Sequence, residues 1–128
     1  MTRVTRFRTG KFDVFAEHPN PINPIPGESL LLWLADCAKP QTIVSPPAPE
    51  DWGWYSTVKW DGRSYMLGSS ASPEDNGDYE WVLQVVKSRS FKEKLLGRAV
   101  MTANDSCANF FQGLLEKEPS FKGGSVDP

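Results

Sequence analysis

The chain has 128 residues, a length that suits one domain with a single core, and 39% of its residues are hydrophobic. Its 14 Lys and Arg against 16 Asp and Glu give a formal net charge of −2, which excludes a global field that attracts nucleic acid or an anionic membrane. The longest apolar run, residues 30–35, is too short to span a bilayer, and the basic N-terminal residues precede no apolar segment typical of a secretory signal. We therefore expect a cytoplasmic protein that binds neither nucleic acid nor membrane.

The first elements in chain order are a short strand, a proline-rich loop and a helix. Residues 11–17 place aromatic residues and valine at mixed spacing, which predicts a short strand. Residues 18–27 hold four prolines, which predict an ordered crossover loop, with a proline-rich ligand motif as the alternative. A helix is predicted over residues 28–39 from an apolar stripe with helical spacing, formed by Leu30, Trp33, Leu34 and Cys37.

The clearest element is a hairpin whose turn is Asp61-Gly62, a dipeptide typical of type I′ turns. It joins strands at residues 54–60 and 63–68 and places Trp60 opposite Arg63. One face of this hairpin should enter the core, and that face carries Trp54, Ser56, Val58, Tyr65 and Leu67.

A third long strand is predicted at residues 79–87, where Trp81, Leu83 and Val85 alternate with more polar positions. The polar residues 69–78 should form the loop between this strand and the hairpin. A shorter β-branched run at residues 42–44 precedes the hairpin. The sequence therefore predicts an antiparallel sheet of about four or five strands.

Two helices are expected after the sheet. Ser90 and Glu93 fit a capping box at the start of a short helix, and a longer helix at residues 105–117 has Phe111 in its apolar stripe. We assign residues 1–118 to a single α+β domain in which the two main helices pack on one face of the sheet. Residues 119–128 are predicted to be a flexible C-terminal tail.

The sequence carries few residues suited to catalysis or metal binding. Cys37 and Cys107 lie on the apolar sides of predicted helices, so we expect two reduced, buried thiols. With one histidine, the chain has too few ligands for an ordinary zinc site, and we expect no metal and no cofactor. His18 could serve either thiol as a base, but a solvated loop histidine is the more common arrangement, so an enzyme is the less favoured hypothesis.

Charged residues cluster in two parts of the chain. A basic strip runs through residues 87–98, where a solvated helix face is favoured because no RNA- or DNA-binding motif accompanies it. The segment 72–80 is acidic, and two further acids lie beside a tryptophan just before the hairpin. Carboxylates beside aromatic anchors are suited to capturing a basic protein. We therefore predict a partner-binding surface made of Glu50, Asp51, Trp52, Glu74, Asp75 and Asp78.

The motif Glu50-Asp51-Trp52-Gly53-Trp54, preceded by prolines and followed by a hairpin and a Trp-bearing strand, resembles small uncharacterised bacterial α+β proteins, including those found among the immunity proteins of toxin systems. The resemblance covers about residues 46–98 and implies a non-enzymatic binding protein. Two hypotheses stay open. The first is a domain that binds a basic protein, for example as an immunity-type inhibitor of a toxin. The second is a small-molecule-binding domain or weak enzyme with a pocket lined by Trp52, Trp54, Tyr55 and Trp60.

Overall fold

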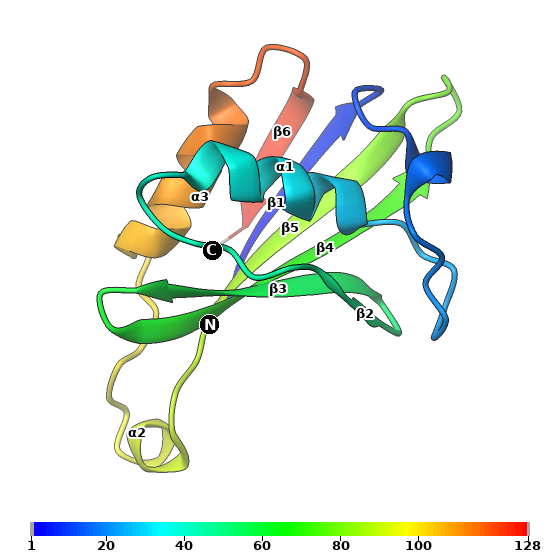
Figure 1. The fold of residues 1–128 in the computed structure, drawn as a ribbon. Helices are drawn as coiled ribbons and strands as arrows, with labels where there is room; N and C mark the ends of the chain where they lie inside the picture. The colour runs from blue at the N-terminus through cyan, green and yellow to red at the C-terminus, as the bar shows by residue number, and fades with distance from the viewer. Residues whose placement is uncertain (1, 128) are drawn as a thin grey trace.

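The computed structural model describes residues 2–127 and shows one six-stranded antiparallel sheet with the helices α1 and α3 on one face (Figure 1). The strand order is β2-β3-β4-β5-β1-β6. The strands are β1 (Thr2–Thr9), β2 (Ala48–Glu50), β3 (Gly53–Trp60), β4 (Arg63–Pro73), β5 (Tyr79–Lys87) and β6 (Lys122–Asp127). The helices are α1 (Glu28–Ala38), α2 (Phe91–Leu95) and α3 (Ser106–Glu116). The predicted α+β class is confirmed, but the sheet is larger than the four or five strands expected.

The β3–β4 hairpin forms as predicted. Trp60 pairs with Arg63 across the turn, and Asp61 and Gly62 have φ angles of 50° and 75°, as a type I′ turn requires. The side chains expected in the core are all buried on the face that the helices cover, and these are Trp54, Ser56, Val58, Tyr65 and Leu67. The opposite face, which neither α1 nor α3 covers, is called the open face (Figure 1).

The strands around this hairpin have boundaries that the apolar pattern did not reveal. β4 continues through Ser69 to Pro73, which were predicted as loop but pair with β5. These residues are small and polar, so they carry no hydrophobic alternation, although Ser69 and Ala71 are buried. The run at residues 42–44 contributes only a single bridge, from Val44 to Val58, and β2 instead forms the edge beside β3.

β1, like β2 and β6, was not predicted from the sequence. The strand predicted at residues 11–17 is wrong, because that segment contains a single 3₁₀ turn at Val14–Ala16. β1 precedes it and pairs with β5 on one side and β6 on the other. The buried face of β1 is mostly polar, which removes the apolar alternation that marks a strand. That face consists of Arg3, Thr5, Phe7 and Thr9.

Helix α1 lies where predicted, but its buried stripe is rotated. The buried apolar residues are Leu30, Leu31, Leu34 and Ala38. Trp33 is only half-buried and packs at the rim against Phe12 and Phe121, so that Leu31 rather than Cys37 faces the sheet. The prediction of a buried Cys37 is therefore wrong, since this thiol is exposed.

Helix α3 packs on the same face and begins where predicted. Asp105 caps it by accepting a hydrogen bond from the backbone nitrogen of Ala108 at 3.1 Å, and Cys107 and Phe111 are fully buried. The chain then returns to the sheet, because residues 122–127, predicted as part of a flexible tail, pair with β1 as β6. All six residues of β6 are exposed, so pairing with β1 rather than burial holds this strand.

Candidate functional site

The proline-rich loop between the 3₁₀ turn and α1 is ordered and is fixed at both ends. The Glu17 carboxylate accepts hydrogen bonds from the backbone nitrogens of Gly27 (3.0 Å) and Ser29 (2.8 Å), and so caps the start of α1. His18 Nδ1 lies 2.9 Å from the carboxylate of Glu28, which is buried. These contacts tie the first residues of the loop to the start of α1, and the Ala71 backbone nitrogen on β4 donates to the Pro26 carbonyl oxygen at 3.0 Å, which holds the loop against the sheet.

The β2–β3 turn carries three of the predicted site residues, Glu50, Asp51 and Trp52. The proline-rich loop holds this turn through two asparagines that the sequence analysis did not single out. Asn20 Nδ2 donates to the carbonyl oxygen of Glu50 at 3.0 Å, and Asn23 Nδ2 donates to that of Asp51 at 2.9 Å. Because their backbone is fixed in this way, the two acidic side chains project from a rigid turn. The only sequence signal for this role is the presence of amides inside a proline-rich loop.

Trp52 lies on the open face of the sheet. Its ring covers Gly68 so closely that a methyl group in place of the glycine hydrogen would lie 2.8 Å from the indole. Beside the half-buried ring is a hollow of about 240 Å³. The hollow is lined by Ile25, Trp52, Ser70, Ala71, Ser72, Glu80 and Val82. Its wall combines an aromatic ring and aliphatic side chains with hydroxyls and one carboxylate.

The β4–β5 turn carries the other predicted site residues, Glu74, Asp75 and Asp78. The first two are exposed, and together with Arg8 and Asn76 they line a shallow hollow of about 190 Å³. Asp78 is half-buried, because its carboxylate lies against Gly10 in the chain that follows β1. Glu80 is also half-buried, so two of the four acids of segment 72–80 that we expected to be exposed, Glu74 and Asp75, are exposed.

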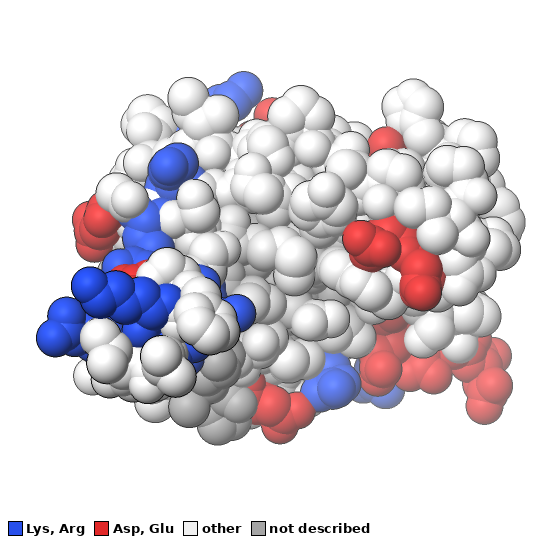
Figure 2. All heavy atoms as spheres, turned by 90° about the horizontal axis from the view of Figure 1, so that it is seen from below, with Lys and Arg blue, Asp and Glu red and all other residues white. Residues whose placement is uncertain are grey.

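The two acidic turns flank the Trp52 hollow. Ser72 and Glu80, which face each other across β4 and β5 just before the β4–β5 turn, form the side of the hollow that points toward that turn. In Figure 2, acidic side chains gather at the right of the molecule, whereas Lys and Arg gather at the left, around α2. We call the first region the acidic end, and it comprises Glu50, Asp51, Glu74, Asp75, Asp78 and Glu80.

Comparison of the chain with models of protein families, with curated proteins and with solved structures finds no match.

The tryptophans of the β2–β4 region do not share a pocket. Trp54 is buried beneath α1, on the opposite face of the sheet from Trp52. Trp60 packs against Phe110 with a ring separation of 4.9 Å, and its indole nitrogen donates to Ser106 Oγ at 2.8 Å. The predicted pocket lined jointly by these rings is therefore wrong. Trp52 lies on the opposite face of the sheet from Trp54, and Trp54 and Trp60, which share the helix-covered face, lie at opposite ends of β3.

The thiols are poorly suited to nucleophilic chemistry. Burial raises the pKa of the Cys107 thiol to about 12. Although the Cys37 thiol is exposed, partial desolvation by its neighbours, together with the nearby carboxylates of Asp36 and Glu118, raises its pKa. Within residues 2–127, no group of three or more His, Cys, Asp or Glu side chains is arranged to hold a metal ion. Over the same residues, no helix is long and apolar enough to cross a membrane.

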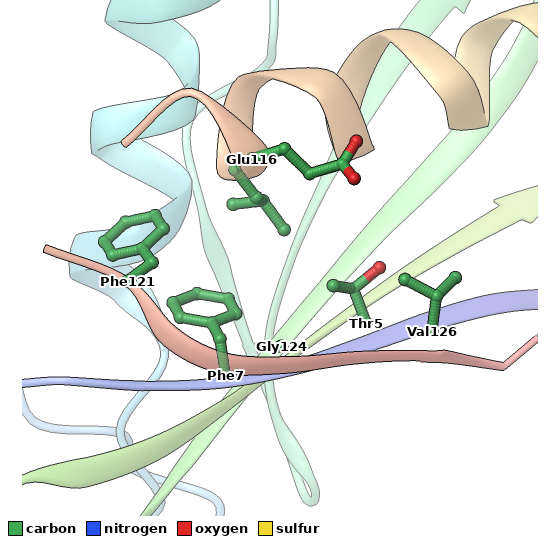
Figure 3. A pocket seen from close by; sticks show the side chains of 7 residues that line it. Thr5, Phe7, Glu116, Phe121, Gly124 and Val126 are labelled. Carbon is green, nitrogen blue, oxygen red and sulfur yellow. The ribbon is translucent and has the colours of Figure 1, made fainter. Parts of the chain in front are cut away.

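A second hollow lies between α3 and the β1–β6 edge of the sheet (Figure 3). Its volume is about 340 Å³, and the stacked rings of Phe7 and Phe121, 4.4 Å apart, form one wall. The Thr5 hydroxyl and the Glu116 carboxylate are the only polar side-chain groups around it. The complete lining is Thr5, Phe7, Leu115, Glu116, Phe121, Gly124 and Val126.

Proposed function

We propose that this chain is a protein-binding domain that captures a basic segment of a partner at its acidic end. Immunity-type inhibition of a cationic bacterial toxin is the form of this activity that we favour. The observation that carries the proposal is the position of Trp52, whose ring forms one wall of a hollow between two acidic turns. An aromatic anchor surrounded by charged rim residues is the usual composition of a protein-binding hot spot.

The chemistry of the hollow favours a lysine or arginine side chain as the group that enters it. The indole face and the aliphatic wall, which includes Val82, suit the apolar stem of such a side chain, and the cationic head would meet Glu80. The carboxylates of Glu74 and Asp75 are exposed and lie farther out, where they attract a positive surface before contact.

The first experiment identifies the partner and tests the hollow. Immobilised protein would be used to capture partners from lysate of the native cells, with Trp52→Ala as a matched control. The proposal expects a protein with a basic surface that the parent retains and the variant loses. A partner retained equally by both proteins would contradict the role of Trp52.

The second experiment tests the acidic rim by binding kinetics at two ionic strengths. Reversing two exposed acids, in Glu74→Lys/Asp75→Lys, should slow association about tenfold at low salt and weaken its salt dependence, because rim charges act mainly through the on-rate. Asp36→Lys/Glu116→Lys reverses two exposed acids outside the acidic end and should leave the on-rate unchanged. An unchanged on-rate in the first variant would move the site away from the β4–β5 turn.

The second hollow supports a second candidate function, binding of a small apolar molecule that carries a positive charge. Its volume of about 340 Å³ is within the range of small-ligand sites, and Glu116 supplies one counter-charge beside the two phenyl rings. A thermal-shift series with aromatic amines should raise the melting temperature of the parent but not of Glu116→Gln. Equal shifts for both proteins would contradict this ligand class.

A further inference from the structure

The segment between β5 and α3 projects from the sheet and carries α2 at its tip (Figure 1). Large apolar side chains in this segment are unusually exposed to water. Phe91 is 80% exposed and Leu95 is 73% exposed, and Leu96 and Val100 are also exposed. Clusters of exposed apolar side chains on a soluble domain usually mark a contact surface. We call residues 88–104 the α2 tip.

The orientation of α2 is fixed by two sets of hydrogen bonds. Ser90 and Glu93 form the predicted capping box, which defines the first turn of the helix. The Glu93 carboxylate also accepts two hydrogen bonds from the Arg63 guanidinium, at 2.9 and 2.7 Å, at the start of β4. The side of α2 that carries Glu93 is therefore tied to the sheet.

The opposite side of α2 is the apolar one. Successive helical residues are rotated by about 100°, so Phe91 and Leu95 share a face that lies across the helix from Glu93. Lys92 and Lys94 fall on the two sides of that face, and both are exposed. The tip thus presents an outward apolar strip with a lysine along each side.

The charge of the tip is strongly positive. Lys92, Lys94 and Arg98 are exposed, and the acid in the helix, Glu93, is already paired with Arg63. Arg89 is partly engaged, because its guanidinium donates to the backbone oxygen of Arg98 at 3.1 Å. Figure 2 shows Lys and Arg side chains gathered at the end of the molecule that carries α2, opposite the acidic end.

Against the expectation from the net charge that the chain binds no membrane, we infer that the α2 tip docks on the surface of an anionic lipid bilayer. In this geometry Phe91 and Leu95 enter the apolar boundary while Lys92 and Lys94 meet lipid phosphates at either side. A soluble polyanion such as RNA would use the cations but would leave the central apolar strip in water. The bilayer is the surface that matches both parts of the tip at once.

The charge asymmetry of the protein favours one orientation on such a surface. The acidic end is repelled by anionic lipid, so the domain would sit with its α2 tip down and Trp52 facing the solvent. Membrane docking and capture of a basic partner would then use different surfaces and could occur together.

The test is cosedimentation of the full chain with phosphatidylcholine vesicles, with and without about 30% phosphatidylserine, at low and physiological ionic strength. The parent should bind only the anionic vesicles. Phe91→Ser/Leu95→Ser should weaken binding by at least about tenfold, because this variant lacks the side chains that insert into the bilayer. Its binding should depend on salt as strongly as that of the parent. Lys92→Ser/Lys94→Ser should weaken binding about twentyfold and reduce the salt dependence.

Matched controls come from exposed residues elsewhere. Ile43→Ser removes a side chain that is 82% exposed, and Lys11→Ser/Lys117→Ser removes two exposed lysines outside the α2 tip. Both variants should bind as the parent does. Thermal melting of every variant would establish that it is folded. We expect all of them to fold, because the altered side chains are exposed.

Three results would overturn the inference. One is the absence of parental binding to anionic vesicles at low salt. Another is a loss of binding in the control lysine variant as large as the loss in Lys92→Ser/Lys94→Ser, which would mean that the attraction is not specific to the α2 tip. The last is binding to anionic vesicles that the substitutions at Phe91 and Leu95 leave unchanged. This result would point to a soluble polyanion as the natural ligand, and binding to RNA and to a polyglutamate peptide would then be compared with binding to the vesicles.

Discussion

Replacing Asp105 with alanine should lower the free energy of unfolding by about 3 kcal/mol, because one carboxylate joins the helical layer to the sheet. Its Oδ1 atom caps α3 through the backbone nitrogen of Ala108, and loss of such a cap costs about 1 kcal/mol. Its Oδ2 atom accepts a hydrogen bond of 2.8 Å from the buried Tyr65 hydroxyl, and leaving this donor without a partner costs about 1–2 kcal/mol. Lys87, with its nitrogen 3.9 Å away, loses its counter-charge as well.

Urea unfolding followed by far-ultraviolet circular dichroism would measure these losses, and a double-mutant cycle would separate them. Tyr65→Phe removes the donor and should cost about 1 kcal/mol. The double variant Tyr65→Phe/Asp105→Ala should cost about 1–2 kcal/mol less than the two single losses combined, because no hydroxyl is left unpaired. Asp105→Asn, which retains an acceptor and a cap, should cost only about 1 kcal/mol. Additive losses in the cycle, or equal losses for the alanine and asparagine variants, would refute the assignment.

Three further predictions follow from burial and charge. Phe111→Ala should cost about 3–5 kcal/mol in urea unfolding, whereas Trp33→Ala should cost about 2 kcal/mol because that ring is half-exposed, and equal losses would contradict the rotated stripe of α1. A thiol-reactive disulfide reagent should modify only Cys37 in the native protein and also Cys107 after unfolding, and modification of both thiols in the native state would contradict the burial of the second. The hydrogen bonds from its arginine partner lower the pKa of Glu93 to about 2, below the ordinary value of 4.5, so the stabilisation of α2 should be complete above about pH 4.5 and be lost as the pH falls toward 2. A carboxyl titration by NMR with a midpoint near 4.5 would refute that ion pair.

The parts of the fold that the sequence predicted are those where burial and periodicity coincide. The β3–β4 hairpin, β5 and the two long helices all alternate apolar and polar residues with the period of their secondary structure. The missed parts lack this agreement. On β1 the buried Arg3 has its guanidinium satisfied by the side chains of Asn109 and Gln112 on α3, and contacts of that range leave no local pattern. β4 beyond Gly68 consists of small, mostly polar residues, so neither its pairing with β5 nor the burial of Ser69 and Ala71 leaves an apolar alternation in the sequence.

The candidate surfaces, too, were predicted from the sequence only in part. The acidic end includes all five of the predicted acids, but residue type alone predicted exposure correctly only for Asp51, Glu74 and Asp75, because Glu50 and Asp78 are half-buried. The placement of Trp52 over Gly68 and the support from Asn20 and Asn23 depend on three segments meeting, which composition does not encode. The positive charge of the α2 tip was visible in the sequence as the basic strip at residues 87–98, but it was interpreted as a solvated helix face. The exposed apolar strip was not predicted, because Phe91 is of a residue type that is usually buried.

The polar character of β1 also bears on how the chain folds during synthesis. β1 is the first strand in the chain, yet its partners are β5 and β6, so it has no strand to pair with until most of the chain has emerged. Meanwhile the β3–β4 hairpin can form locally, and closure of the sheet by β1 becomes a slow, long-range step. An unpaired strand rich in valine and isoleucine would tend to pair with other chains and aggregate. The arginine and threonine residues on both faces of β1 oppose such pairing. The same polar residues that remove the apolar alternation from β1 thus limit its aggregation until β5 and β6 have been synthesised.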